Sequence, residues 1–193
     1  MNEKKQLTTR KLAFLAMMTA LVFAGNYARI VLPISFGGQT SFTLANILCC
    51  LSGVMLGPIG GLASGLGSAL YDITNPLFAP ECWLTFLTKG TLGLAAGLTV
   101  NFRREADAPL TYRRALTASA VGCAAYYVLY FCKSFYYNGL LVEGLQPMVA
   151  LATLPLKIPA SVFNAAVAIV AAPPLAIALK TALRRSGLLL NRS

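Results

Sequence analysis

The sequence predicts an all-α integral membrane protein with six transmembrane helices and both chain termini in the cytoplasm. Three observations predict this fold: the composition, the recurrence of apolar stretches long enough to cross a bilayer, and the placement of the basic residues. Of the 193 residues, 57% are hydrophobic and 11% are charged, whereas soluble domains carry about a quarter charged residues. We therefore expect one transmembrane domain, residues 1–193, with little chain left for a soluble domain.

Apolar stretches of about 20 residues can each cross the hydrocarbon core as a helix. One apolar segment, residues 43–73, is too long for a single span and is interrupted at Gly57 and Pro58. Glycine is typical after the end of a helix and proline at the start of one, which predicts a tight turn between two short helices. The expected spans are residues 12–32, 43–56, 58–73, 82–100, 115–137 and 149–180.

The basic residues predict the orientation. Four of the 16 Lys and Arg residues precede the first span, four lie in residues 101–114, and four lie at the end of the last span and beyond it. Basic residues that flank spans stay preferentially in the cytoplasm. A single kinked span over residues 43–73 would put residues 101–114 outside, whereas a cytoplasmic turn at Gly57 keeps all three segments inside. The same clustering argues against nucleic-acid binding, despite a net charge of +10.

The glycine-rich stretch "LGPIGGLASGLGSALYDITNP" is not a phosphate-binding loop. It contains no Gly-Lys-Ser/Thr sequence, which a Walker A motif requires. Glycines four residues apart, such as Gly61 and Gly65, instead allow close approach of a neighbouring helix. The chain has no histidine, which excludes a Ser-His-Asp triad and H-E-x-x-H zinc chemistry. We therefore expect no catalytic residue, no metal and no cofactor bound by this chain.

Charged residues at the outer ends of the spans indicate a ligand site, because intramembrane charge is usually functional. Arg29, Lys89, Lys133 and Lys157 lie in this layer with one acid, Asp72. One acid cannot neutralise four cations, which predicts an outward-facing pocket for a small anionic molecule. A structural ion pair with Asp72, or snorkelling of single lysines to the surface, remains an alternative.

Polar and aromatic residues near these charges complete the expected pocket. Trp83 and Tyr136 fit an interfacial aromatic belt as well as a binding site. The expected substrate-binding residues are Arg29, Gln39, Thr40, Asp72, Asn75, Trp83, Lys89, Lys133, Tyr136, Lys157 and Asn164.

Four segments together resemble a known family. They are "LAFLAMMTAL", "SFTLANILCCLSGVMLGPIGGLASGLGSALYD", "TFLTKGTLGLAAGL" and "LPLKIPASVFNA". In order and spacing they are similar to the substrate-binding S component of energy-coupling factor (ECF) vitamin transporters. The resemblance implies six spans and high-affinity binding of a vitamin or precursor near the outer face. It also implies delivery of that substrate inward by toppling within a prokaryotic cytoplasmic membrane.

The resemblance further implies the partners of the chain. S components associate with a transmembrane coupling protein and with two cytoplasmic ATPase subunits, which hydrolyse the ATP. In that family, small residues four apart in the first span contact the coupling protein, and Ala16, Ala20 and Ala24 match this pattern. The excess of basic side chains favours an anionic vitamin such as pantothenate or folate. The alternative is a membrane-embedded enzyme that acts on an anionic lipid or isoprenoid substrate.

Overall fold

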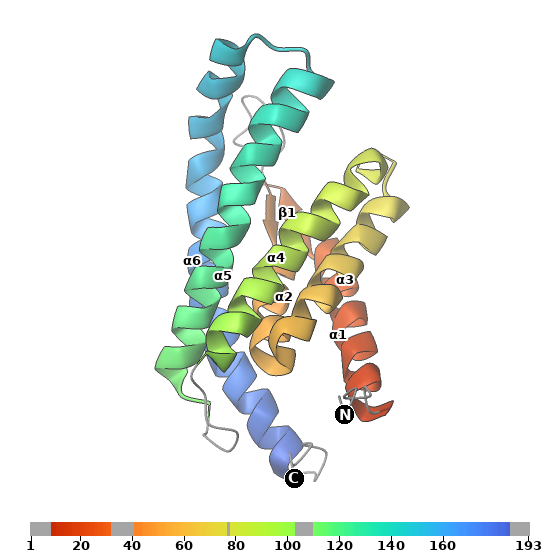
Figure 1. Cartoon of the computed structure of the whole chain (residues 1–193), viewed down its shortest axis with the longest axis vertical. Coiled ribbons are helices and arrows are strands. Elements are labelled where there is room, and N and C mark those ends of the chain that lie inside the picture. The colour runs from red at the N-terminus through yellow and green to blue at the C-terminus, as the bar shows by residue number, and fades with distance from the viewer. Residues whose placement is uncertain (1–8, 32–40, 77, 103–109, 186–193) are drawn as a thin grey trace, which may run out of the picture.

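The computed structural model describes residues 9–31, 41–76, 78–102 and 110–185 of the chain. This part is mainly helical and also contains one short antiparallel pair of strands (Figure 1). The helices are α1 (Thr9–Tyr27), α2 (Ala45–Leu56), α3 (Gly60–Thr74), α4 (Cys82–Asn101), α5 (Tyr112–Lys133) and α6 (Pro147–Arg185).

The first helix is shorter than the sequence predicts. It ends at Tyr27, and the chain then forms β1 (Arg29–Val31), which pairs antiparallel with β2 (Ser41–Thr43) and places Ile30 opposite Phe42. The β-branched pair Ile30 and Val31 favours an extended backbone at this point. The expected span of residues 12–32 is therefore wrong at its outer end.

The chain turns sharply between α2 and α3, as the Gly-Pro pair predicts. Gly57 has a φ of 69°, a left-handed conformation that glycine adopts without steric penalty. The two helices are antiparallel and in contact, since the hydroxyl groups of Ser52 and Ser64 lie 2.7 Å apart. With 12 and 15 residues, they are about 18 and 22 Å long, and both are shorter than the other helices.

Small residues bring α4 against this helical hairpin. A Cβ atom at Gly93 would lie 2.4 Å from Ser64 Oγ, and a Cβ atom at Gly97 would lie 2.2 Å from the backbone of Gly57. These approaches are too close for any side chain larger than hydrogen. The Gly57 turn therefore packs against the C-terminal end of α4, where Arg114 also donates a 2.9 Å hydrogen bond to the Val100 carbonyl oxygen.

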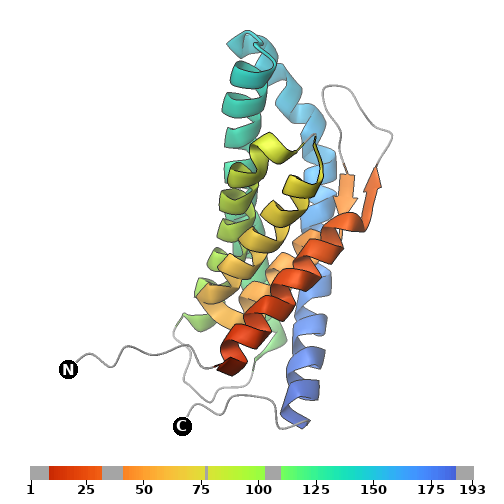
Figure 2. The ribbon, with the colours of Figure 1, turned by 90° about the vertical axis from the view of Figure 1, so that its right-hand side faces the viewer.

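Helices α5 and α6 form a second hairpin, which extends beyond the connection between α3 and α4 (Figures 1 and 2). α5 continues into a π-helical segment, η3 (Ser134–Val142), and Gly144 then turns the chain with a φ of 61°. The expected span of residues 115–137 is therefore shorter than this helical stretch. α6 runs without interruption through Pro155, Pro159, Pro173 and Pro174.

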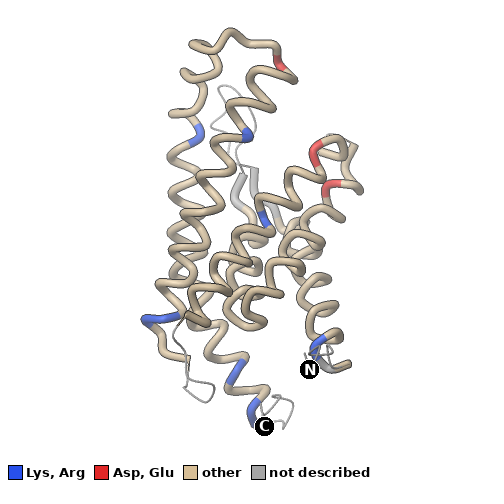
Figure 3. The backbone as a smooth tube through the Cα atoms, viewed as in Figure 1, with Lys and Arg blue, Asp and Glu red and all other residues tan. Residues whose placement is uncertain are grey.

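By length and composition, three helical stretches of the described chain can cross a membrane. They are residues Ala45–Thr74, which include the Gly57 turn, Tyr112–Val142 and Pro147–Arg185, and a shorter apolar helix covers Lys11–Tyr27. Large apolar side chains such as Leu66, Val128 and Phe163 are exposed on the outside of the bundle, as expected of a surface that faces lipid. Many of the Lys and Arg residues lie at the end where α1 begins and α6 ends, and the acidic residues lie towards the opposite end together with further basic residues (Figure 3).

Candidate ligand-binding cavity

A polar cavity of about 360 Å³ lies between the helices, within the range of about 300–1,000 Å³ typical of small-molecule sites. Residues of α1, α2, α3, α4, α5, η3 and α6 line it, together with Thr43 of β2 and residues of the connection between α3 and α4. One partly open site thus draws side chains from nearly every element of the described fold.

A buried lysine joins three helices in this cavity. Lys89 of α4 is 8% exposed and donates a hydrogen bond to Asn46 Oδ1 of α2, and its Nζ lies 4.6 Å from the ring centroid of Tyr126 of α5. An amide oxygen and an aromatic face are both favourable partners for an ammonium group. We call Asn46, Lys89 and Tyr126 the inner cluster.

Buried polar side chains surround the inner cluster. Asn26, Asp72 and Asn164 are each less than 9% exposed and line the same cavity. Asn164 Oδ1 accepts a 3.4 Å hydrogen bond from the backbone N–H of Thr43, which ties α6 to β2. Amide groups of this kind can both donate and accept hydrogen bonds, so the inner part of the cavity suits a ligand with mixed donors and acceptors.

A second group of charged residues lies nearer the acidic end of the molecule. Glu81 Oε2 is 2.6 Å from Lys133 Nζ, and Asn138 Nδ2 donates a 2.9 Å hydrogen bond to Glu81 Oε1. Glu81 precedes Lys89 by two helical turns, or about 12 Å along the helix. We call Glu81, Lys133 and Asn138 the rim cluster.

The π-helical segment positions part of this rim. At its C-terminal end, the N–H of Glu143 bonds to the Asn138 carbonyl at 2.9 Å, five residues back. Lys157 Nζ of α6 donates a 2.6 Å hydrogen bond to Ser134 Oγ at the start of the segment. π-helical turns are rare and occur frequently at functional sites, and here Ser134 and Asn138 both face the cavity.

Three tyrosines of α5 form an aromatic wall of the cavity. Tyr126, Tyr127 and Tyr130 all line it, and the rings of Tyr126 and Tyr130 stack with centroids 5.9 Å apart and an interplanar angle of 30°. Their spacing of three and four residues puts Tyr130 on the same helical face as the other two. The wall offers ring faces on which a flat aromatic ligand can pack.

The formal charges of the described cavity lining balance. Lys89, Lys133 and Lys157 are matched by three acids, Asp72, Glu81 and Glu143. The expected surplus of cations over a single acid is therefore wrong for these residues. Glu81 and Glu143 lie between expected spans, and the sequence alone does not indicate that they turn towards the lysines. Among the described lining residues, no surplus cation supports an anionic ligand.

The comparison with known proteins identifies the family of the chain. A family model described as the ECF-type riboflavin transporter S component matches residues 6–181. The chain belongs to this family. No curated protein matches it. Members of the family are membrane-embedded substrate-binding subunits of importers, and they work with an ECF module of transmembrane and ATPase subunits. The protein is thus a vitamin-transport subunit and not an enzyme, which sets aside the alternative of a lipid-modifying enzyme.

The S component brings five of its expected site residues together. Asp72, Lys89, Lys133, Lys157 and Asn164 come from four different helices and line the one cavity.

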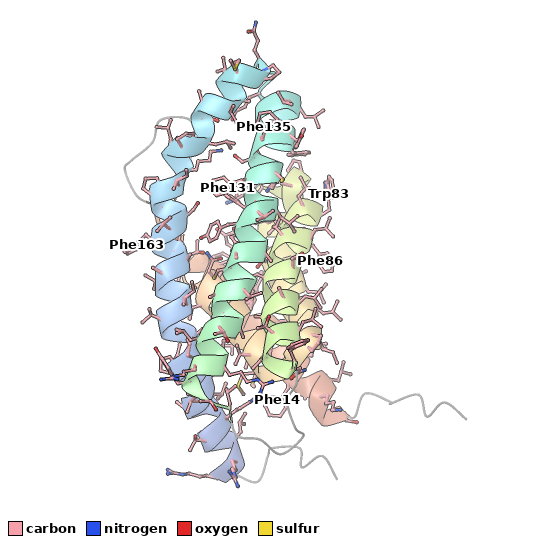
Figure 4. The ribbon with its side chains drawn as sticks, turned by 60° about the vertical axis from the view of Figure 1, so that its left-hand side comes forward. Phe14, Trp83, Phe86, Phe131, Phe135 and Phe163 are labelled. Atoms are coloured by element: carbon pink, nitrogen blue, oxygen red, sulfur yellow. The ribbon has the colours of Figure 1, made fainter. Side chains whose placement is uncertain are left out.

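Three expected site residues do not line the cavity. Trp83 is 55% exposed and Tyr136 is 62% exposed, and Trp83 points away from the helices (Figure 4). Its ring packs edge-to-face against Tyr137, with centroids 6.2 Å apart, which agrees with the alternative of an interfacial belt. Asn75 instead shapes the connection after α3, because its carbonyl accepts hydrogen bonds from the N–H groups of Phe78 and Ala79.

Three other expected residues cannot be placed. Gln39 and Thr40 lie outside the described residues of the S component, and so does the side chain of Arg29, whose backbone belongs to β1.

Sequence reasoning missed much of the cavity lining. Asn26 and Asn46 carried a usable signal, because amides are rare within apolar spans and seek a partner there. The "YYVLY" sequence of α5 carried another, since its three tyrosines recur at helical spacing. Nothing comparable indicated Glu81, which reaches the cavity from the connection between α3 and α4.

The alanine stripe of α1 lies on the outside of the described bundle. Ala16, Ala20 and Ala24 are exposed, while Met18 and Val22 of the same helix are buried. The stripe is thus not part of the internal helix packing of this S component.

Proposed function

We propose that this S component binds riboflavin, or a flavin with the same ring system and side chain, in the cavity and passes it inward with an ECF module. One observation carries the proposal: in a member of the riboflavin-type family, the cavity combines an aromatic wall with balanced charge. Riboflavin is uncharged and joins a flat aromatic ring to a hydroxyl-rich chain. The tyrosines suit the ring, and the amide and hydroxyl side chains suit the chain.

Pantothenate and folate fit the described cavity less well. Each carries carboxylate, and the cavity lysines already face Asp72, Glu81 and Glu143 in equal number. A buried carboxylate without a surplus cation is costly. We therefore replace the expectation of an anionic vitamin with a neutral flavin.

We further propose six spans with both termini in the cytoplasm. The Gly57 turn packs against the same end of α4 that contacts Arg114, and this end of the molecule carries basic residues and no described acidic residue (Figure 3). Basic flanks favour the cytoplasmic side. This orientation opens the cavity towards the outer face of a prokaryotic cytoplasmic membrane.

The exposed alanines of α1 support a docking face for the transmembrane coupling protein. Small residues at Ala16, Ala20 and Ala24 would let a partner helix approach closely within the bilayer. The S component itself would bind no cofactor and no nucleic acid, since ATP would be hydrolysed by the two ATPase subunits. Toppling of the S component against the coupling protein would then release the substrate inside.

The first test identifies the ligand directly. The tagged S component is purified in mild detergent and extracted, and its small molecules are identified by mass spectrometry. We expect riboflavin or a close relative at about one molecule per chain. The purified protein is then titrated with riboflavin, pantothenate and folate, and flavin binding is followed by quenching of flavin fluorescence. Saturable binding of pantothenate or folate, with none of riboflavin, would refute the flavin proposal.

A further inference from the structure

Glu81 connects two separate parts of the cavity wall. It lies in η2 (Ala79–Glu81), in the connection between α3 and α4, and its two carboxylate oxygens contact Lys133 and Asn138. Lys133 is the last residue of α5, and Asn138 lies in η3. One carboxylate thus holds the α3–α4 connection against the α5 side of the cavity.

The ion pair within this contact is shielded from solvent. The side chains of Lys133 and Glu81 are 15% and 16% exposed, so solvent and salt weaken their attraction less than that of a fully exposed pair. Charged partners also strengthen hydrogen bonds. The rim cluster is therefore a partly buried, specific contact between the α3–α4 connection and the α5 side of the cavity.

The α5 side of this contact is anchored independently. Lys157 of α6 bonds Ser134 at 2.6 Å, and a Cβ atom at Gly139 would lie 2.9 Å from Ala150 Cβ of α6. η3 is thus packed tightly on α6. In the described part of the α3–α4 connection, the N–H groups of Phe78 and Ala79 bond to the Asn75 carbonyl. The glycine packing of α3 against α4 involves neither Lys133 nor Asn138.

We propose that the rim cluster is a latch that closes the outer end of the cavity and opens when the ligand enters or leaves. The inference rests on the ligand-binding function proposed above, and it assigns Glu81 to the control of access. In the closed state, Glu81 bonds Lys133 and Asn138 above the inner cluster. In the open state, these two contacts break and the α3–α4 connection moves away from α5.

The first experiment measures how fast riboflavin dissociates. Glu81→Gln keeps an acceptor for Asn138 but removes the ion pair, and we expect the dissociation rate to rise by about tenfold, the effect of losing one charge-assisted hydrogen bond. The double variant Glu81→Lys with Lys133→Glu restores an ion pair and should return the rate to within about threefold of the original. Glu143→Gln removes the same charge from another position in the cavity lining and serves as the matched charge control.

The second experiment needs no ligand, so it separates the latch from the flavin proposal. Ser161, a buried residue of the cavity lining, is replaced by cysteine, with and without Glu81→Gln. The chain is treated with a small neutral methanethiosulfonate reagent, and modification of residue 161 is followed by peptide mass spectrometry. We expect Glu81→Gln to speed modification by about tenfold, by the same reasoning, and the charge-swapped pair to slow it again.

Two results would overturn the latch. One is equal dissociation and modification rates with and without Glu81→Gln, even where thermal stability falls, because the contact would then be structural alone. The other is an equal effect of Glu143→Gln, which would assign the change to net charge. If riboflavin does not bind the original chain while modification responds as expected, the flavin proposal fails and the latch stands.

Discussion

Lys89 of α4 donates a hydrogen bond to Asn46 of α2, and the two side chains are buried. Because Lys89 Nζ also lies 4.6 Å from the ring centroid of Tyr126 of α5, one cation joins three helices inside the membrane bundle. A buried lysine requires such partners, and its position in the cavity lining places a strong donor where a ligand would lie.

Loss of this donor should weaken ligand binding. We expect Lys89→Met to lower riboflavin affinity by about tenfold to a hundredfold, since hydrogen bonds from charged groups contribute roughly 1.5–3 kcal/mol. Fluorescence titration measures the dissociation constant. Lys180→Met, near the C-terminal end of α6, is the control and should bind as the original chain does. An unchanged dissociation constant for Lys89→Met would remove Lys89 from the site.

The aromatic wall should contribute through its ring faces. Tyr130→Leu removes a ring that stacks on Tyr126, and we expect flavin affinity to fall by about tenfold, since an aromatic contact provides roughly 0.5–1.5 kcal/mol beyond its buried area. Tyr130→Phe keeps the ring, and its flavin affinity should stay within about threefold of that of the original chain. If the Phe variant loses as much affinity as the Leu variant, the hydroxyl and not the ring would matter.

The contact between the Gly57 turn and α4 should be intolerant of a side chain. A Cβ atom at Gly97 would lie 2.2 Å from the Gly57 backbone, whereas the nearest atom to a Cβ atom at Gly90 of the same helix is 3.5 Å away. We expect Gly97→Ala to lower stability by about 1–3 kcal/mol through overpacking. Gly90→Ala should be tolerated. Thermal unfolding in detergent compares the two, and equal melting temperatures would contradict this packing.

A larger side chain in the alanine stripe of α1 should impair assembly with the partner subunits and leave ligand binding unchanged. Ala20 is exposed, so Ala20→Leu should leave flavin affinity unchanged while it prevents close approach of a partner helix. Ala166→Leu, at an exposed alanine of α6, is the matched control. Co-purification with coexpressed coupling protein and ATPases should fall by about fivefold or more for Ala20→Leu alone. Full assembly of this variant would place the docking face elsewhere.

Local sequence signals predicted much of the helical framework. Gly57 and Pro58 marked the turn because their backbone preferences operate within a few residues. The glycines at positions 61, 65, 93 and 97 likewise indicated close helix packing, and each lies against a neighbouring element in the structure. The end of α1 was missed, because the apolar composition of Ile30 and Val31 suits a membrane helix as well as a strand.

The site was predicted less completely than the framework. Asp72, Lys89 and Asn164 stood out as polar residues within apolar segments, and they do line the cavity. The tyrosines of α5 were not recognised, because a tyrosine in a membrane helix fits an interfacial belt equally well.

By itself, the sequence determined that this chain is a helical membrane protein, where its central turn lies and that Asp72, Lys89 and Asn164 are polar residues within apolar segments. Those properties follow from the composition of the chain and from the backbone preferences of residues that are close in sequence. Only the tertiary structure decided that Glu81 pairs with Lys133, 52 residues away, and that the charges of the described cavity lining balance. Such pairing depends on how helices approach and rotate, which no local spacing encodes.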